Sequence, residues 1–190
     1  MRLEGLEPDI KIENVVASVT LDQEIDLMRI CRRFPHTEYD PRRFPGLIYR
    51  LKRPKATALL FNSGKMVVTG AKSEREAHNA VRNIVRRLNT KGIVKKNPKV
   101  RVEINNVVAS ANLFTGIDLE KAAEKLDLAM YEPEEFPGIV YQIREPRVVV
   151  LVFATGNVVC TGARKKKEVL KALDRLRKEL REKNLCYRRA

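Results

Sequence analysis

An internal repeat with a constant spacing of 92 residues limits what this chain of 190 residues can fold into more than any other feature. The segment PRRFPGLIYR at residues 41–50 returns as PEEFPGIVYQ at 133–142, and IENVVAS at 12–18 returns as INNVVAS at 104–110. A repeat this long is a small domain rather than a solenoid unit, and two copies predict a particle with pseudo-twofold symmetry. The predicted repeats are residues 1–92 and 93–190.

Runs of β-branched and apolar residues predict that most of each repeat is antiparallel sheet. Asn62-Ser63-Gly64 has the composition of a hairpin connection between two of these runs. In the first repeat the expected strands cover residues 10–20, 44–52, 55–61 and 65–70.

One short helix and one long helix are expected in each repeat. The short helix within residues 21–33 should bury Ile25, Met28 and either Cys31 or Arg32, which have helical spacing. Ser73 and Glu76 form a capping-box pattern at the start of the long helix. The apolar seams expected on the two long helices are Ala77, Ala80, Val81, Ile84, Val85 and Leu88, and Val169, Leu173, Leu176 and Leu180.

The strands lack the alternation expected of a sheet with one wet face. Ala58 and Leu60 fall on one face of their strand, but Leu59 and Phe61 on the other face are apolar too, and the run VVVLVF at 148–153 has no polar position. Two helices per repeat can cover only one face of the sheet. The other face should therefore stay uncovered, and an apolar surface of that size marks a binding site.

The composition indicates a polyanionic partner, because the formal net charge is +14 and the pI is about 9.9. No apolar run reaches the roughly 18–20 residues of a membrane span, and the acidic N-terminus broken by Pro8 does not resemble a signal peptide. Three cysteines without a C-x-x-C spacing argue against disulfides and zinc. We expect no metal, no cofactor and a cytoplasmic, nucleoid-associated location, or a nuclear one in a eukaryote.

The few polar residues on the uncovered face favour DNA as the partner. Asparagine and threonine side chains can donate hydrogen bonds to adenine N3 and thymine O2, the only polar groups of A·T pairs in the minor groove. A guanine amino group would oppose these donors. The face is therefore predicted to read an A·T-rich minor groove through Asn14, Val16, Ser18 and Thr69 in the first repeat and Asn106, Val108, Ser110 and Thr161 in the second.

Four phenylalanines at equivalent positions could act as wedges. Phe44 and Phe136 are expected at strand starts beside stiff turns, and Phe61 and Phe153 at the ends of neighbouring strands. Apolar side chains inserted between base steps kink a duplex at an energetic cost that the extra protein contact offsets. A pair at each end of the uncovered face predicts kinks at both ends of the site.

Over most of its length, roughly residues 10–180, the chain resembles the TATA-box-binding proteins of the archaeal type, most clearly in FPGLIYRLKRPKATALLFNSGKMVVTGAKS. The resemblance implies an α+β saddle with a curved ten-stranded antiparallel sheet, helices on the convex face and DNA on the concave face. It also implies a general transcription factor, not an enzyme, that bends the TATA box and assembles with transcription factor B and RNA polymerase. The DNA-binding residues that it implies are Asn14, Val16, Phe44, Pro45, Arg50, Leu59, Phe61, Lys65, Val67, Thr69, Lys72, Asn106, Val108, Phe136, Pro137, Leu151, Phe153, Val159, Thr161 and Arg164.

The charges of the two repeats differ, although their apolar frames match. Gln142 and Asn157 replace the basic Arg50 and Lys65, which predicts weaker phosphate contacts in the second repeat. In the acidic loop of the second repeat, Glu132 and Glu134 match the positions that bind transcription factor B in the family. At the equivalent positions of the first loop, Arg42 and Arg43 are expected to sit near flanking phosphates or to repel that factor from the wrong end. The chain ends in the basic segment REKNLCYRRA, where many archaeal members of the family have an acidic tail. The arginines and lysines of the long helices suggest acidic partners, including the polymerase machinery.

Three alternatives remain open from the residues. The uncovered face could pair with a second copy in a homodimer that forms when no DNA is bound. It could instead stack single-stranded bases, but such sheets carry aromatic residues at the centre, where this one has Asn, Val and Thr. Catalysis is disfavoured because the face lacks a Cys–His pair, paired carboxylates and metal-ligand spacing, and His36 and His78 are isolated.

Overall fold

The computed structural model describes residues 8–187 and has an α+β fold. The chain packs into two compact units. We call residues 14–106 the first half, and residues 8–13 with 107–187 the second half. Residues 1–7 and 188–190 lie outside the described residues, so the predictions for the N-terminus and for the end of the basic C-terminal segment are not addressed by the structure.

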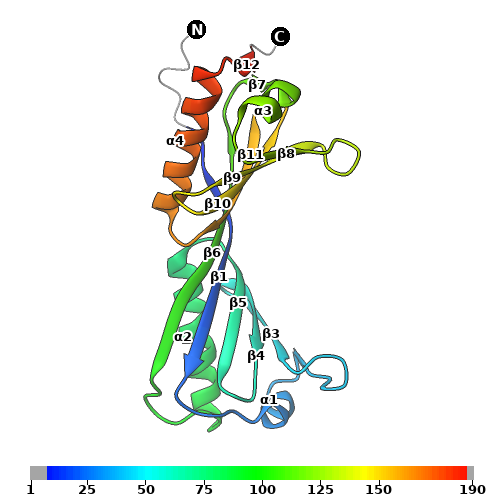
Figure 1. Cartoon of the computed structure of the whole chain (residues 1–190). Coiled ribbons are helices and arrows are strands. Elements are labelled where there is room, and N and C mark those ends of the chain that lie inside the picture. The colour runs from blue at the N-terminus through cyan, green and yellow to red at the C-terminus, as the bar shows by residue number, and fades with distance from the viewer. Residues whose placement is uncertain (1–7, 188–190) are drawn as a thin grey trace. The chain divides into compact units, whose positions relative to one another are not determined.

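The first half contains most of strand β1, strands β2 to β5, helices α1 and α2, and the beginning of strand β6 (Figure 1). The first strand, β1, begins within the second half and continues into the first, and the long strand β6 ends the first half and continues into the second. The elements are β1 (Lys11–Leu21), α1 (Leu27–Arg33), β2 (Thr37–Glu38), β3 (Leu47–Lys52), β4 (Lys55–Leu60), β5 (Lys65–Ala71), α2 (Glu74–Thr90) and β6 (Val100–Asn112).

The second half repeats this order of elements after β6. Its elements are β7 (Gly116–Ile117), α3 (Leu119–Lys125), β8 (Ala129–Tyr131), β9 (Gly138–Ile143), β10 (Val148–Phe153), β11 (Asn157–Ala163), α4 (Lys166–Glu182) and β12 (Cys186–Tyr187). The strand β12 pairs with β7 in a separate two-stranded sheet. None of the described helices is long and apolar enough to cross a membrane.

The main sheet contains ten antiparallel strands in the order β2-β3-β4-β5-β1-β6-β11-β10-β9-β8. The register is equivalent in the two halves: Leu59 lies opposite Val67, and Leu151 lies opposite Val159. The β1–β5 and β6–β11 pairs both contain a register shift at their Val15 and Val107 ends. The predicted α+β class, the two repeats and the ten-stranded sheet are confirmed.

One long helix covers one face of the strands in each half. The predicted capping box of α2 is present, with the Ser73 side chain accepting a hydrogen bond from the Glu76 backbone amide over 3.0 Å. The seam of α2 packs into the core of the first half, except that Val85 is only half-buried. The predicted seam of α4 is fully buried.

The opposite face of the strands carries half-buried side chains, as the sequence predicted. In β10 burial alternates strictly: Val148, Val150 and Val152 are buried, whereas the side chains between them are not. We call this surface the open face. Its strand residues include Asn14, Val16, Ser18, Ile48, Arg50, Thr57, Leu59, Val67 and Thr69 in the first half, and Val108, Ser110, Val140, Val149, Leu151, Phe153, Val159 and Thr161 in the second.

Two predictions about local structure were wrong. The helix α1 lies within the expected segment and is capped by Asp26, which accepts a hydrogen bond from the Arg29 amide, but its buried side is different: it buries Leu27 and Ile30, while Met28 is 50% exposed. The strand β3 begins at Leu47 rather than at residue 44, because a turn closed by hydrogen bonds to the Asp40 carbonyl includes Phe44.

Candidate nucleic-acid interface

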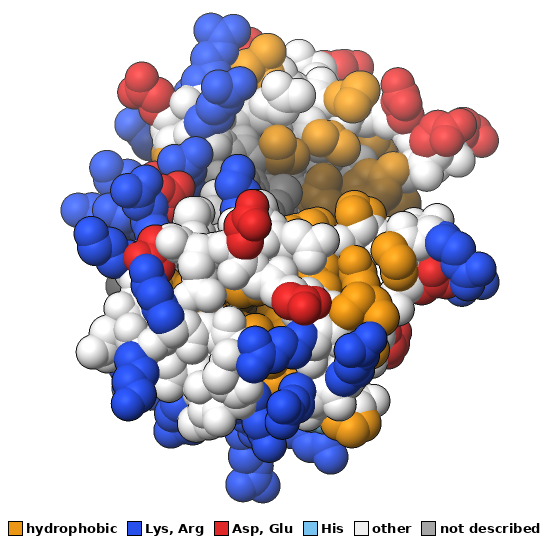
Figure 2. Space-filling view, turned by 90° about the horizontal axis from the view of Figure 1, so that it is seen from below, with side chains coloured by type: hydrophobic (Ala, Val, Ile, Leu, Met, Phe, Trp, Pro, Cys, Tyr) orange, Lys and Arg blue, Asp and Glu red, His pale blue; other side chains and the backbone are white. Residues whose placement is uncertain are grey.

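The open face is apolar in each half and carries few charges among its central residues. In the first half Leu59 lies opposite Val67, and Val67 lies opposite Ser18 on β1. In the second half Leu151 lies opposite Val159, and Val159 lies opposite Ser110 on β6. Figure 2 shows hydrophobic side chains gathered on the surface, with many lysines and arginines elsewhere in the same view. Half-buried valines and leucines in such number indicate a surface that binds a partner.

Asn14 is held in one orientation by its neighbours in the first half. Its Oδ1 accepts a hydrogen bond from the Gly70 amide over 2.7 Å, and its Nδ2 lies 3.1 Å from Thr69 Oγ1. Asn14 and Thr69 were both predicted to belong to the polar centre, and the structure brings them together. The amide keeps donor capacity beyond its bond to Thr69, because Nδ2 carries two hydrogens.

The second half holds Val108 and Thr161 on the same face as predicted. Ser110 is engaged within the protein, because its hydroxyl donates a hydrogen bond of 2.6 Å to the Glu13 carboxylate. That contact was not predicted, since Glu13 is 97 residues away in the chain. Asn106 is half-buried near the end of the first half.

The four predicted wedge residues form two aromatic pairs, one in each half. The ring centroids of Phe44 and Phe61 are 5.9 Å apart, and those of Phe136 and Phe153 are 5.6 Å apart, both with edge-to-face geometry. Phe44 is 39% exposed, and the other three are half-buried. Pro45 and Pro137 are exposed directly after the first ring of each pair.

The glycine of each Phe-Pro-Gly segment explains why the segment is repeated. A Cβ on Gly46 would lie 2.6 Å from the Phe44 ring and 3.0 Å from the Phe61 ring. A Cβ on Gly138 would lie 3.0 Å from the Phe136 ring and 3.2 Å from the Phe153 ring. The absent side chain therefore makes room for the aromatic pair.

The loops that precede these segments have opposite charges. Arg42 and Arg43 are exposed in the first loop and form ion pairs with Asp40 at 3.3 and 3.9 Å. In the second loop Glu132, Glu134 and Glu135 are exposed. Both loops use the same backbone turn, with the carbonyl of Asp40 or Glu132 accepting the amide of the phenylalanine four residues on.

The predicted basic contacts lie at the margins of the open face. Arg50 is on β3 and forms an ion pair with Glu38 of the neighbouring strand β2. Lys65 begins β5, and Lys72 and Arg164 follow β5 and β11, where their backbone amides donate to the first-turn glutamates of α2 and α4. All four are exposed.

The described residues offer little for chemistry. They contain no group of three or more His, Cys, Asp or Glu side chains that could hold a metal ion. Cys31, Cys160 and Cys186 are free, and burial raises the pKa of the Cys160 thiol to about 11. That thiol is therefore protonated and unreactive at neutral pH.

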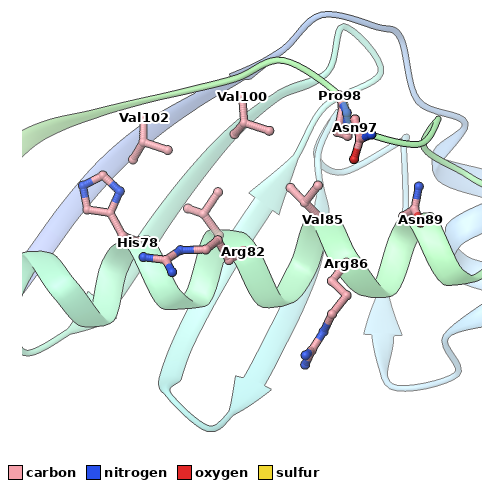
Figure 3. A pocket seen from close by; sticks show the side chains of 10 residues that line it. His78, Arg82, Val85, Arg86, Asn89, Asn97, Pro98, Val100 and Val102 are labelled. Carbon is pink, nitrogen blue, oxygen red and sulfur yellow. The ribbon is translucent and has the colours of Figure 1, made fainter.

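A groove lies on the helix side of the first half, between α2 and the start of β6 (Figure 3). It has a volume of about 390 Å³. Val85, Val100 and Val102 contribute apolar side chains to its lining, and the polar and charged lining residues include His78 and Arg82. No local sequence pattern predicts this groove, because α2 and β6 are joined by an irregular connection.

These features define a class of protein: two related half-sheets, each with helices on one side and an apolar binding face on the other. A family model described as "Transcription factor TFIID (or TATA-binding protein, TBP)" matches the chain twice, at residues 9–91 and 101–183. The chain belongs to this TATA-binding protein family. Family membership also confirms that it is a transcription factor and not an enzyme.

Curated relatives and a solved structure agree with this assignment. The TATA-box-binding protein of Pyrobaculum calidifontis is 48% identical over 181 residues, 95% of this chain and 90% of the relative. That of Pyrodictium occultum is 51% identical over 177 residues, 93% of this chain and 88% of the relative. Methanococcus jannaschii TBP matches with a TM-score of 0.84 and 41% identity over 92% of this chain and 99% of that chain.

Proposed function

We propose that the chain is a general transcription factor that binds the A·T-rich TATA box of promoters through its open face, in the minor groove. The observation that carries the proposal is the apolar open face with the oriented amide of Asn14 among its few polar groups. A·T pairs present only acceptors in the minor groove, and an amide donor on an apolar surface complements them. The names of the curated relatives, TATA-box-binding proteins, support the same ligand.

The aromatic pairs are proposed to insert between base steps at the two ends of the bound site and to bend the duplex. Phe44 packs against Phe61 and Phe136 packs against Phe153, and a glycine beside each pair leaves room for the rings. Inserted apolar side chains bend DNA in other minor-groove proteins, a principle for which the TATA-binding protein itself is a standard example. Pro45 and Pro137 would stiffen the segment behind each leading ring.

The acidic loop of the second half is proposed to bind transcription factor B through Glu132 and Glu134. The basic loop of the first half would repel the same partner surface, so that a protein with two similar halves recruits its partner at one end. Assembly with RNA polymerase would follow at the promoter. In the absence of DNA, two copies would pair through their open faces as a homodimer. The location that we propose is cytoplasmic and nucleoid-associated.

A gel-shift experiment with three duplexes tests the groove assignment. The duplexes are an A·T-rich site, the same site with inosine·cytosine pairs, and the same site with G·C pairs. Inosine lacks the guanine amino group, so the first two present similar minor grooves and different major grooves. We expect the first two to bind alike and the G·C duplex to bind about 100-fold more weakly. Equal binding of the G·C duplex, or of single strands, would contradict the proposal.

A further inference from the structure

A second concave site lies at the outer edge of the first half, away from the centre of the open face. It is a cleft of about 830 Å³. Its lining comes from four different segments: the residues around β2, the strand β3, the turn after β3, and α2. The residues that line it are His36, Glu38, Arg50, Lys52, Arg53 and Arg87.

The walls of the cleft are fixed to the core. Tyr49 is fully buried beneath it, and its ring contacts that of His36 edge to face at a centroid distance of 5.4 Å. The Tyr49 hydroxyl lies 3.5 Å from Nη1 of Arg87, which attaches the helix to the sheet edge. The carbonyl of Arg53 accepts a hydrogen bond of 3.1 Å from Asn83 Nδ2 on α2. The cations therefore project from ordered elements rather than from a long loop.

The cleft carries an excess of positive charge. Its four cationic side chains face a single carboxylate, Glu38, which forms an ion pair with Arg50. A concave surface lined by one sign of charge focuses the field and concentrates counter-ions. The guanidinium and ammonium groups of these side chains suit phosphate oxygens.

The equivalent place in the second half has lost this character. The residues 92 positions later replace Arg53 by Glu145 and Arg87 by Glu179, and Glu179 forms an ion pair with Arg175 at 3.0 Å. Arg50 becomes Gln142. Because the same half-fold accommodates glutamates at these positions, its stability does not require the cations of the first half.

We propose that this cationic cleft binds backbone phosphates of duplex DNA that lies beyond the base pairs covered by the open face. The inference rests on the proposed function, because it requires a duplex on the open face. Arg50 connects the two surfaces: it stands on the open side of β3 and also lines the cleft. A side chain in this position can contact phosphates from either surface. The first half then holds flanking DNA that the second half does not hold.

The test uses the full chain with the double variant Arg53→Glu and Arg87→Glu, which installs the residues of the second half and leaves Arg50 in place. Two duplexes carry the same A·T-rich site, one ending close to the site and one extended by about 10 base pairs, one helical turn, on each side. We expect the variant to bind the extended duplex about tenfold more weakly at moderate salt and its salt slope to fall by about two. Binding of the short duplex should stay within about threefold of the wild type.

A matched control separates a local contact from net charge. Lys167→Glu with Lys171→Glu makes the same change in charge on α4 and should leave the difference between the two duplexes unchanged. Thermal melting checks folding, and Arg53→Gln with Arg87→Gln serves if the glutamates unfold the first half. Equal losses in the cleft variant and the control would overturn the proposal.

Two further outcomes keep this proposal distinct from the proposed function. The preference of the wild type for A·T over G·C on the short duplex tests the open face alone, so its loss would remove the proposed function without reference to the cleft. Poly-glutamate is the second probe. If it binds the wild type but not the cleft variant, while the extended duplex binds both equally, the cleft docks an acidic protein and the proposal is wrong.

Discussion

The two halves of the molecule share an apolar frame and differ in the charges around it. On the open face, Phe61, Leu59 and Thr69 of the first half have identical residues at the equivalent positions of the second half. At the margins the charges change: Arg50, Lys65, Arg42 and Arg87 correspond to Gln142, Asn157, Glu134 and Glu179. Duplication therefore supplied the same contact surface twice, and the margins distinguish one end of the molecule from the other.

At the margin of the second half, a pair of hydrogen-bonded asparagines stands where the first half has a lysine. Asn157 Oδ1 accepts a hydrogen bond of 2.6 Å from Asn112 Nδ2, whereas the first half has Lys65 at the equivalent position, the start of β5. Phosphate contacts contribute to affinity in proportion to the counterions that they release. We therefore expect the first half to dominate the salt dependence of DNA binding.

The largest effect is expected from Asn14→Asp, which tests whether the open face shared by the two halves contacts the bases. The aspartate can still accept the Gly70 amide, so the local structure should survive, but it replaces a donor by a negative charge opposite acceptor groups. Affinity for an A·T-rich duplex should fall about 100-fold, measured by fluorescence anisotropy. An unchanged affinity would mean that Asn14 does not face the bases. Asn14→Ser, which keeps a donor, is the control and should lose less.

The second-largest effect concerns the charged loops and tests whether their charges determine which half binds transcription factor B. Glu132→Arg with Glu134→Arg makes the second loop resemble the first. Capture of transcription factor B on a promoter duplex should fall by about 30-fold because like charges now meet at the contact. DNA affinity alone should change by less than about threefold. A loss of DNA binding instead would show that this loop contacts the duplex. Arg42→Glu with Arg43→Glu provides the mirror variant.

Removing one wedge should have a smaller effect on affinity than on DNA shape. In Phe136→Ala the ring pair with Phe153 is lost, so the base step at that end should stay stacked. Energy transfer between dyes on the duplex ends should report a smaller bend, while affinity falls by about tenfold or less. Phe44→Ala makes the equivalent change in the first half. Unchanged bending in both variants would exclude insertion by these rings.

The smallest effect concerns Tyr141, a buried tyrosine of the second half. In the second half burial and the neighbouring Glu179 raise the pKa of Tyr141 to about 12. A raised pKa means that the folded protein keeps this proton to a higher pH than the unfolded chain does. The contribution of Tyr141 to the free energy of unfolding is therefore fully present below about pH 10 and decreases as the pH rises toward 12. At pH 11 the wild type should have lost about 1 kcal/mol through this group, and Tyr141→Phe should abolish that part of the decrease. Denaturant unfolding at pH 8 and 11 measures it.

Much of the fold could be predicted because the relevant signals are local. Burial along β4 and β5 follows the faces that period two assigned to Ala58, Leu60, Met66 and Val68, and Ser73 caps α2 as expected. The buried side of α1 was wrong, because the apolar spacing of Ile25 and Met28 indicated a different side of the helix from the one that follows the Asp26 N-cap. The early start of β3 was wrong for a related reason: the Asp40 turn, rather than strand propensity, determines the position of Phe44.

The site was predictable where the repeat and the alternation of strands determine it. Asn14 and Thr69 were placed on the same face by period two and are in contact in the structure. What could not be predicted depends on long-range contacts. One example is the hydrogen bond between Ser110 and Glu13, which are far apart in the chain. Another is the cleft lined by His36, Arg53 and Arg87, which come from three different segments. No local sequence pattern indicates that these segments meet.

The bond between the Gly70 amide and Asn14 has a consequence for the energetics of recognition. Fixing a flexible side chain upon association costs about 0.5–1.5 kcal/mol, which weakens a complex by up to an order of magnitude. Here the amide plane is already immobilised when the protein folds. The reading group thus meets its ligand preorganised, with its rotational entropy already lost.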